Sequence, residues 1–248
     1  MERTGLNDAV EKTRNGAIVY DTDLLNQISD ATFTAGGWAT AQPVTGVLRS
    51  AGRGNTMIVT DGQQEFVLRH YMRGGLPGRL IRDKYLWAGE AQTRSFVEWH
   101  LLVKLIAFKL PVPRPAAARY CRTGPVYTAD LLTVRAPGIR SLAERISQGP
   151  GDVEFWQNLG ADLHQFHAAG VFHADLNAYN VQVDQNDKLF LLDFDRGKLL
   201  PPGVWQQKNI SRLHRSMRKI KRLEPKLYYV AANWKQFLDG YFSASRSA

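Results

Sequence analysis

Cysteine is almost absent from this chain of 248 residues, and Cys121 is the only one. An intramolecular disulfide therefore cannot form, and a zinc site built from several cysteines of one chain is excluded. Long apolar runs are also missing, because the segment 101–110 is interrupted by Lys104 and Lys109 and is shorter than the roughly 20 residues of a membrane-spanning helix. The first residues are polar and of mixed charge, so we expect no signal peptide. These absences favour a reducing compartment and, at most, peripheral contact with a membrane.

Positive charge is what the chain has in excess, with 32 Lys and Arg against 23 Asp and Glu and a formal net charge of +9. A basic surface attracts nucleic acid, anionic lipid or phosphorylated substrates. The cations gather in two clusters, which are Arg79, Arg82 and Lys84, and Lys208, Arg212, Arg215, Arg218, Lys219, Lys221 and Arg222. Either a solvated helix face or a surface for anionic lipid accounts for the second cluster. Nucleic-acid binding is not expected, because no ribonucleoprotein motif and no helix-turn-helix pattern is present.

Periodicity predicts a strand-rich first part of the chain and a mainly helical second part. The strand-prone runs are short and separated by turn residues such as Asp61-Gly62; they lie at 47–50, 56–60, 65–71, 116–122, 126–134, 181–183 and 189–192. The helix-prone segments carry apolar residues at helical spacing; they are 92–109, 152–169 and a last, basic helix at 209–222. The expected link between these two parts is Arg135-Ala136-Pro137-Gly138. We therefore predict an α+β protein with parts 1–134 and 135–248.

The strongest chemical signal is His173-Ala174-Asp175-Leu176-Asn177-Ala178-Tyr179-Asn180, followed by Leu191-Leu192-Asp193-Phe194-Asp195. Phosphoryl transfer needs a carboxylate that orients the acceptor hydroxyl and receives its proton, and oxygen ligands that hold magnesium on the ATP phosphates. Asp175 suits the first task, and Asn180 and Asp193 suit the second. An Asp and an Asn in a surface turn are usually only turn formers. Here they follow a long helix and precede a strand that ends in Asp-Phe, which favours a phosphotransfer site.

The same residues resemble those of protein kinases. The loop is similar to the His-Arg-Asp catalytic loop, and 193–195 is similar to the Asp-Phe-Gly element. The closer resemblance, which includes Asp-Phe-Asp-Arg-Gly at 193–197, is to the lipopolysaccharide 3-deoxy-D-manno-octulosonic acid (Kdo) kinases. Further matching stretches lie at 69–75, 129–133 and 209–216. The resemblance implies a bilobal protein-kinase-like fold, with an antiparallel-sheet N-lobe that contains one helix and a mainly helical C-lobe.

The resemblance also implies a reaction, in which the γ-phosphate of ATP moves, with Mg²⁺, to position 4 of a Kdo residue on a lipid A precursor during lipopolysaccharide inner-core biosynthesis. It implies a peripheral protein at the cytoplasmic face of the bacterial inner membrane, in contact with anionic inner-leaflet lipid. A kinase for another sugar, small molecule or protein stays open, as does, less favourably, a basic nucleic-acid-binding protein. A pseudokinase scaffold is disfavoured because the base and both magnesium ligands are present.

Departures from the protein-kinase pattern concern the nucleotide. Arg69 stands where protein kinases carry the lysine that contacts the α- and β-phosphates, and Glu98 is its expected ion-pair partner. The glycine-rich loop is reduced to Gly52-Arg53-Gly54. Arg53 and Gly54 are assigned to nucleotide binding because a guanidinium and backbone amides can approach phosphate; a plain hairpin turn is the alternative.

Two residues beside the predicted metal ligands have other expected roles. Asp195 replaces the glycine of Asp-Phe-Gly, and it is either a further metal ligand or a partner for Arg196. His173 is expected to bond the backbone near Asp193.

Overall fold

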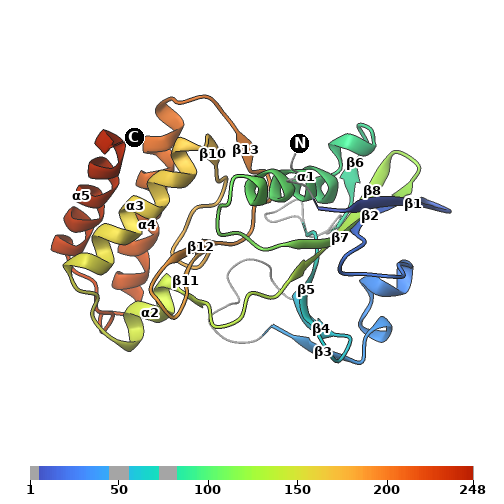
Figure 1. Ribbon diagram of the computed structural model, residues 1–248, viewed down its shortest axis with the longest axis horizontal. Coiled ribbons are helices and arrows are strands. Elements are labelled where there is room, and N and C mark those ends of the chain that lie inside the picture. The colour runs from blue at the N-terminus through green and yellow to red at the C-terminus, as the bar shows by residue number, and fades with distance from the viewer. Residues whose placement is uncertain (1–5, 45–55, 73–82, 248) are drawn as a thin grey trace. The chain divides into compact units, whose positions relative to one another are not determined.

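The computed structural model describes residues 6–44, 56–72 and 83–247, which fall into two units. One unit comprises Met1–Ala107 and Pro113–Ala136, and the other comprises Phe108–Val112 and Pro137–Ala248. Strands dominate the first unit and helices dominate the second (Figure 1). The predicted combination of helices with antiparallel sheets is therefore confirmed.

Eight strands among the described residues of the first unit form one antiparallel sheet, in the order β1-β2-β7-β8-β5-β4-β3, with β6 paired to β8. The strands are β1 (Asp8–Thr13), β2 (Gly16–Asp21), β3 (Thr40–Pro43), β4 (Thr56–Thr60), β5 (Glu65–His70), β6 (Tyr85–Leu86), β7 (Pro115–Thr123) and β8 (Val126–Val134). The predicted strand at 47–50 lies outside the described residues. The structure instead pairs β3 with β4, and β4 with β5 across the expected Asp61-Gly62 turn.

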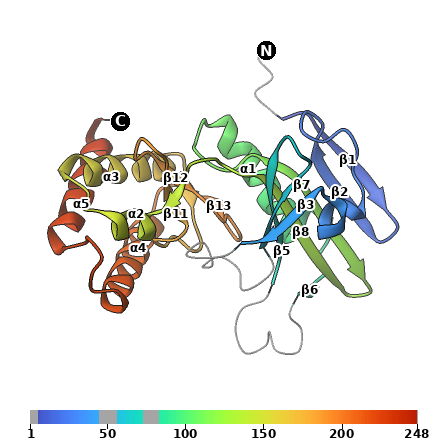
Figure 2. The same cartoon turned by 90° about the horizontal axis from the view of Figure 1, so that it is seen from below.

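Helix α1 (Arg94–Ala107) packs along β7 and β8 on one face of this sheet (Figure 2). Its apolar residues recur at helical spacing, and Phe96, Trp99 and Leu102 are all buried. The helix is shorter than predicted at both ends. A short 3-10 turn, Glu90–Gln92, precedes it, and Lys109 adopts a left-handed conformation with φ of 59° shortly after it.

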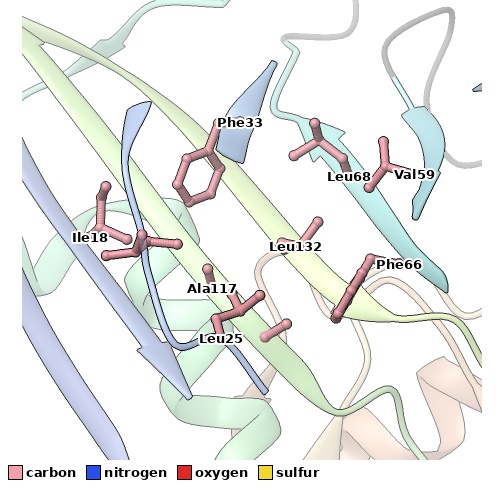
Figure 3. Packing of buried hydrophobic residues seen from close by; sticks show 10 residues of the cluster. Ile18, Leu25, Phe33, Val59, Phe66, Leu68, Ala117 and Leu132 are labelled. Atoms are coloured by element: carbon pink, nitrogen blue, oxygen red, sulfur yellow. The ribbon is translucent and has the colours of Figure 1, made fainter. Parts of the chain in front are cut away.

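The opposite face of the sheet is covered by the N-terminal segment, for which the sequence pattern indicated no role. A buried apolar cluster forms there, in which Leu25 and Phe33 pack against side chains from the central strands (Figure 3). Phe33 ends the 3-10 turn Asp30–Phe33. Strands β1 and β2 extend the sheet beyond β7. The first 40 residues therefore complete both the edge and one face of this unit.

The second unit contains four α-helices and five short strands among its described residues. The helices are α2 (Leu142–Gln148), α3 (Val153–Ala168), α4 (Val204–Leu223) and α5 (Ala231–Ser247). The strands are β9 (Arg140–Ser141), β10 (Val171–Phe172), β11 (Val181–Val183), β12 (Leu189–Leu191) and β13 (Lys198–Leu199). The prediction that the basic helix is the last one is wrong, because α5 follows it. Of the helices in the described residues, none combines the length and the apolar character needed to span a bilayer.

Helices α3 and α5 approach each other closely because each has a glycine at the contact. A Cβ atom added at Gly160 would lie 2.0 Å from the carbonyl oxygen of Phe237, and one added at Gly240 would lie 2.0 Å from that of Gln157. No other residue fits at either position without moving a backbone.

Strand pleating sends the neighbouring residues Arg69 and His70 to opposite faces of the first sheet. His70 lies opposite Asp130 in the β5–β8 register, and its Nδ1 is 2.7 Å from the carboxylate of Asp130. Asp130 is buried and also accepts two hydrogen bonds from the guanidinium of Arg119. Asp83 lies 3.4 Å from the other ring nitrogen. The hydrogen bond to Asp130 is the main reason that the pKa of His70 is raised above 6.5.

Replacing His70 with Gln should therefore remove a pH-dependent part of the stability. A folded-state pKa above the unfolded value means that protonated His70 stabilises the fold fully below about pH 6.5, and that this contribution disappears as the pH rises through the folded value. We expect the unfolding free energies of wild type and His70→Gln to differ more at about pH 5.5 than at about pH 8.5. Urea unfolding measures the difference. His100→Gln, at an exposed position on α1 of the same unit, controls for the loss of a histidine, and a difference that does not change with pH would contradict the assignment.

Candidate active site

The loop that carries Asp175 connects β10 to β11 and is closed by two asparagine side chains. Nδ2 of Asn177 and Nδ2 of Asn180 both donate to the backbone carbonyl oxygen of Asp175, each over 2.9 Å. Oδ1 of Asn177 accepts from the backbone N–H groups of Tyr179 and Asn180, at 2.9 and 3.1 Å. Leu176, whose side chain is fully buried, anchors the loop in the hydrophobic core. The amide groups thus fix the backbone on both sides of Asp175.

Asn180 is also joined to the segment that carries Asp193. Strands β11 and β12 form an antiparallel hairpin, and directly beyond β12 the N–H of Leu192 donates to the carbonyl of Asn180 over 3.0 Å. Asp193 follows with a φ of 63°, a left-handed conformation that is uncommon for a residue other than glycine. Its Oδ1 accepts from the N–H of Asp195 at 3.4 Å. The structure therefore links Asp175 to Asn180 directly, and Asn180 to the residue before Asp193.

His173 connects the same two segments through its ring. Nε2–H donates to the carbonyl of Leu192 over 2.9 Å, while Nδ1 accepts from the N–H of Asp175 over 3.2 Å. The ring is fully buried beside Phe194, at a centroid distance of 5.1 Å. Burial lowers the pKa of His173 below its usual value, which agrees with a neutral ring that donates on one side and accepts on the other. The expected bond from His173 to the backbone next to Asp193 is present.

One side of helix α4 holds this loop in place. Asn209 is buried and bonds both backbone groups of His173, accepting from its N–H over 3.1 Å and donating to its carbonyl over 3.0 Å. Oγ of Ser216 accepts from the N–H of Ala178 over 3.1 Å. Asn209 and Ser216 lie seven residues apart, which places them on the same side of a helix. Sequence reasoning treated 209–222 as a basic helix and 209–216 as part of the family resemblance, but it missed these two contacts.

Arg212 lies on the same side of α4, between these two residues. Its Nε donates to Oδ1 of Asp175 over 3.2 Å, and its Nη2 donates to the same oxygen. The side chains of Arg212 and Asp175 are 45% and 43% exposed. The pair is therefore open to solvent, whereas the contacts of Asn209 are buried. Arg212 was assigned to the basic cluster, and the structure shows that it contacts the proposed base.

In the first unit, Arg69 and Glu98 form the expected ion pair. The face of β5 that is opposite to His70 directs Arg69 toward α1, and its Nη2 lies 2.5 Å from Oε2 of Glu98. The hydroxyl of Tyr71 donates to the same carboxylate oxygen over 2.6 Å. Glu98 is buried, with 3% of its side chain exposed. A buried carboxylate that is paired and hydrogen-bonded in this way holds the guanidinium in one orientation.

Two residues assigned to the nucleotide, Arg53 and Gly54, lie outside the described residues. Of the two clusters of cations, Arg79 and Arg82 also lie outside them. The structure therefore places Asp175, Asn180, Asp193, Arg69 and Glu98.

Asn180 and Asp193 provide oxygen donors of the kind that magnesium prefers. The side-chain amide of Asn180 uses its nitrogen for the carbonyl of Asp175, so its oxygen is the atom suited to a cation. Asp193 adds a carboxylate. Magnesium in phosphotransfer sites is commonly held by one or two protein side chains, with water and phosphate oxygens completing its coordination. This donor set fits that requirement.

Comparison with known proteins gives a consistent result. The model of the lipopolysaccharide kinase (Kdo/WaaP) family matches residues 38–241. A 3-deoxy-D-manno-octulosonic acid kinase of Xanthomonas axonopodis pv. citri is 44% identical over 208 residues, which is 83% of this chain and 82% of that protein. A protein of the same name from Vibrio parahaemolyticus is 40% identical over 205 residues, which is 83% of this chain and 85% of that protein. The residues matched by the family model include the loop and the hairpin described above. The match to each relative covers most of the chain.

Asn209→Ala should destabilise the loop around Asp175. The substitution leaves the N–H and the carbonyl of His173 without their partners, which costs about 2–4 kcal/mol because both groups are buried. Urea unfolding should show this loss, and hydrogen exchange should show faster exchange at the amides of 173–175. Lys208→Ala, at the exposed neighbouring position, is the matched control. Equal stability of the two variants would remove the role assigned to Asn209.

Proposed function

The chain belongs to the lipopolysaccharide kinase (Kdo/WaaP) family, and from that premise we propose that it transfers the γ-phosphate of ATP to a Kdo hydroxyl of a lipid A precursor. The proposed acceptor is the hydroxyl at position 4, and the proposed pathway is the biosynthesis of the lipopolysaccharide inner core. The arrangement of Asp175, Asn180 and Asp193 on one loop and the adjoining hairpin is the observation that supports this proposal most directly.

Asp175 is proposed as the catalytic base. The acceptor oxygen forms a bond to the γ-phosphorus, the bond from that phosphorus to the bridging oxygen of ADP breaks, and the hydroxyl proton passes to the Asp175 carboxylate. The loop supports this role because its backbone bonds present the Asp175 side chain to solvent rather than to the core. A base that meets a bulky, lipid-linked acceptor must be accessible in this way.

Asn180 and Asp193 are proposed to hold Mg²⁺ on the ATP phosphates. The ion, when bound, neutralises charge that develops on the phosphoryl oxygens. His173 holds the segment that carries Asp175 next to the segment that carries Asp193, because its ring bonds the N–H of Asp175 and the carbonyl of Leu192. Its neutral ring adds no positive charge beside the metal ligands.

Nucleotide binding is proposed for Arg69, with Glu98 as the group that orients it. The buried Glu98 carboxylate and the Tyr71 hydroxyl support this role. Arg53 and Gly54 remain proposed nucleotide contacts. In a bilobal protein-kinase-like fold, residues 1–134 would be the N-lobe and residues 135–248 the C-lobe, and this arrangement is also part of the proposal.

Anionic lipid of the inner leaflet is the proposed second partner, at the cytoplasmic face of the inner membrane. Arg215, Lys219 and Arg222 are exposed at spacings of four and three residues along α4, so they form a stripe on one side of the helix. The stripe excludes Lys221, whose ammonium group donates to the carbonyls of Pro225 and Leu227 near the end of the helix. A cationic stripe of this kind attracts an anionic surface.

The reaction is tested with a Kdo-bearing lipid A precursor, ATP and Mg²⁺. Mass spectrometry should find one added phosphate with the wild-type protein. Asp175→Asn should lower kcat by ~10²–10⁴-fold, the usual contribution of a general base, while ATP binding measured by calorimetry stays close to wild type. Asn has nearly the size of Asp but cannot take up the proton.

Three other outcomes would count against parts of this proposal. Wild-type turnover by Asp175→Asn would refute the role of Asp175 as the base. Phosphorylation of another sugar or of a protein, but not of the Kdo acceptor, would show that the proposed substrate is wrong. Salt-sensitive binding to nucleic acid without any phosphotransfer would show that the protein is a nucleic-acid-binding protein and not a kinase.

Charge reversal of the stripe, as Arg215→Glu with Lys219→Glu and Arg222→Glu, should weaken capture by vesicles that contain anionic lipid. Three lost contacts at about 1 kcal/mol each predict a reduction of at least roughly 10²-fold in the partition coefficient. Sedimentation with anionic and with neutral vesicles measures it. The control reverses three exposed lysines elsewhere, Lys104, Lys188 and Lys235. If both triple variants lose binding equally, overall charge rather than this stripe is responsible.

A further inference from the structure

We propose that Arg212 binds the carboxylate of the acceptor sugar and that, in doing so, it releases Asp175 to act as the base. This inference rests on the proposed function and identifies a specificity-determining residue within it. It starts from the pairing of Arg212 with Asp175, for which the reaction described above has no use.

The pairing engages Oδ1, one of the two carboxylate oxygens of Asp175. Nε and Nη2 of Arg212 both donate to Oδ1 of Asp175. A carboxylate oxygen has two lone pairs, so Oδ1 is fully engaged while Arg212 is in place. For the acceptor hydroxyl to bond Oδ1, the guanidinium must first move to another partner.

The exposure of the pair allows such an exchange. Arg212 is 45% exposed and Asp175 is 43% exposed, and ion pairs open to solvent are weak because water competes for both partners. The neighbouring contacts from α4 differ, since Asn209 is buried and Asn209 and Ser216 both bond backbone groups. The loop is therefore held by Asn209 and Ser216, and Arg212 is free to change partner without releasing it.

The acceptor named by the relatives supplies a suitable new partner. A 3-deoxy-D-manno-octulosonic acid carries a carboxylate at neutral pH. The planar guanidinium offers parallel donors that match a carboxylate in a bidentate pair. An acceptor that brings its own carboxylate to Arg212 replaces Asp175 as the anion in the pair, so the charge balance is kept. A neutral sugar cannot make this replacement, and Asp175 stays engaged.

The inference is tested with two acceptors, the Kdo-lipid A precursor and the same molecule with its Kdo carboxyl group converted to the methyl ester. Wild type should prefer the acid over the ester by roughly 10–10²-fold in kcat/KM, the range expected when a hydrogen bond to a charged group is lost. Arg212→Gln should lose this preference, with a ratio near one. Arg212→Lys, which keeps the charge without the planar fork, should lie between them and covers the case in which Arg212→Gln is too slow to measure.

Arg246→Gln, an exposed arginine on α5, is the matched control and should keep the wild-type ratio. If Arg212→Gln slows both acceptors equally and keeps the preference for the acid, Arg212 only positions Asp175 and the inference is overturned. A wild-type protein that phosphorylates neither acceptor would instead refute the proposed function, and the inference would fall with it. The two failures can be told apart, because failure of the inference alone is seen only when the wild-type protein is active.

Discussion

The backbone carbonyl of Asp175 is the group on which the candidate site depends. Two side-chain amides, from Asn177 and Asn180, donate to this one oxygen. An interior carbonyl has two lone pairs and is costly to leave unpaired, so the two amides and the carbonyl fix one another. The loop can then present a carboxylate outward while its backbone is fully used inward. Asn180 is part of this closure and a proposed metal ligand, so the same bonds position the proposed metal ligand and the proposed base.

The alternation of side chains along β5 explains why two chemically different neighbours occur in the first unit. Arg69 faces α1 and its buried partner Glu98, whereas His70 faces the N-terminal segment and the carboxylate of Asp130. Residues 69–71 and 129–131, which stand apart in the sequence, meet where β5 pairs with β8. A one-residue slip of β5 would exchange the two faces and break both pairs. The orientation of the proposed nucleotide arginine is thus tied to the packing of the opposite face.

Sequence reasoning located the elements whose own residues carry the signal. Helix α3 was predicted over 152–169 and runs over Val153–Ala168, because its apolar face is regular. Helix α5 was missed, since Gly240 and a serine-rich end weaken its helical pattern, and that glycine is required by the close approach to α3. Strand β1 is polar and mostly exposed, as an edge strand can be. Strand β1 is held by its pairing with β2, and the local sequence pattern does not reveal this pairing.

The same limit applies to the site. The loop and the hairpin were found because their residue types suit phosphoryl transfer, and the Arg69–Glu98 pair was expected from the resemblance. The contacts of α4 were not found, because a cation in a basic helix looks the same in sequence whether it faces solvent or a carboxylate. The structure distinguishes these cations by their contacts. Arg212 bonds the carboxylate of Asp175 although it is itself exposed, and the exposed stripe of Arg215, Lys219 and Arg222 continues from it along the helix. One helix can therefore both hold the loop that carries Asp175 and present charge to an anionic surface, because Asn209 and Ser216 contact the loop while neighbouring cations stay exposed.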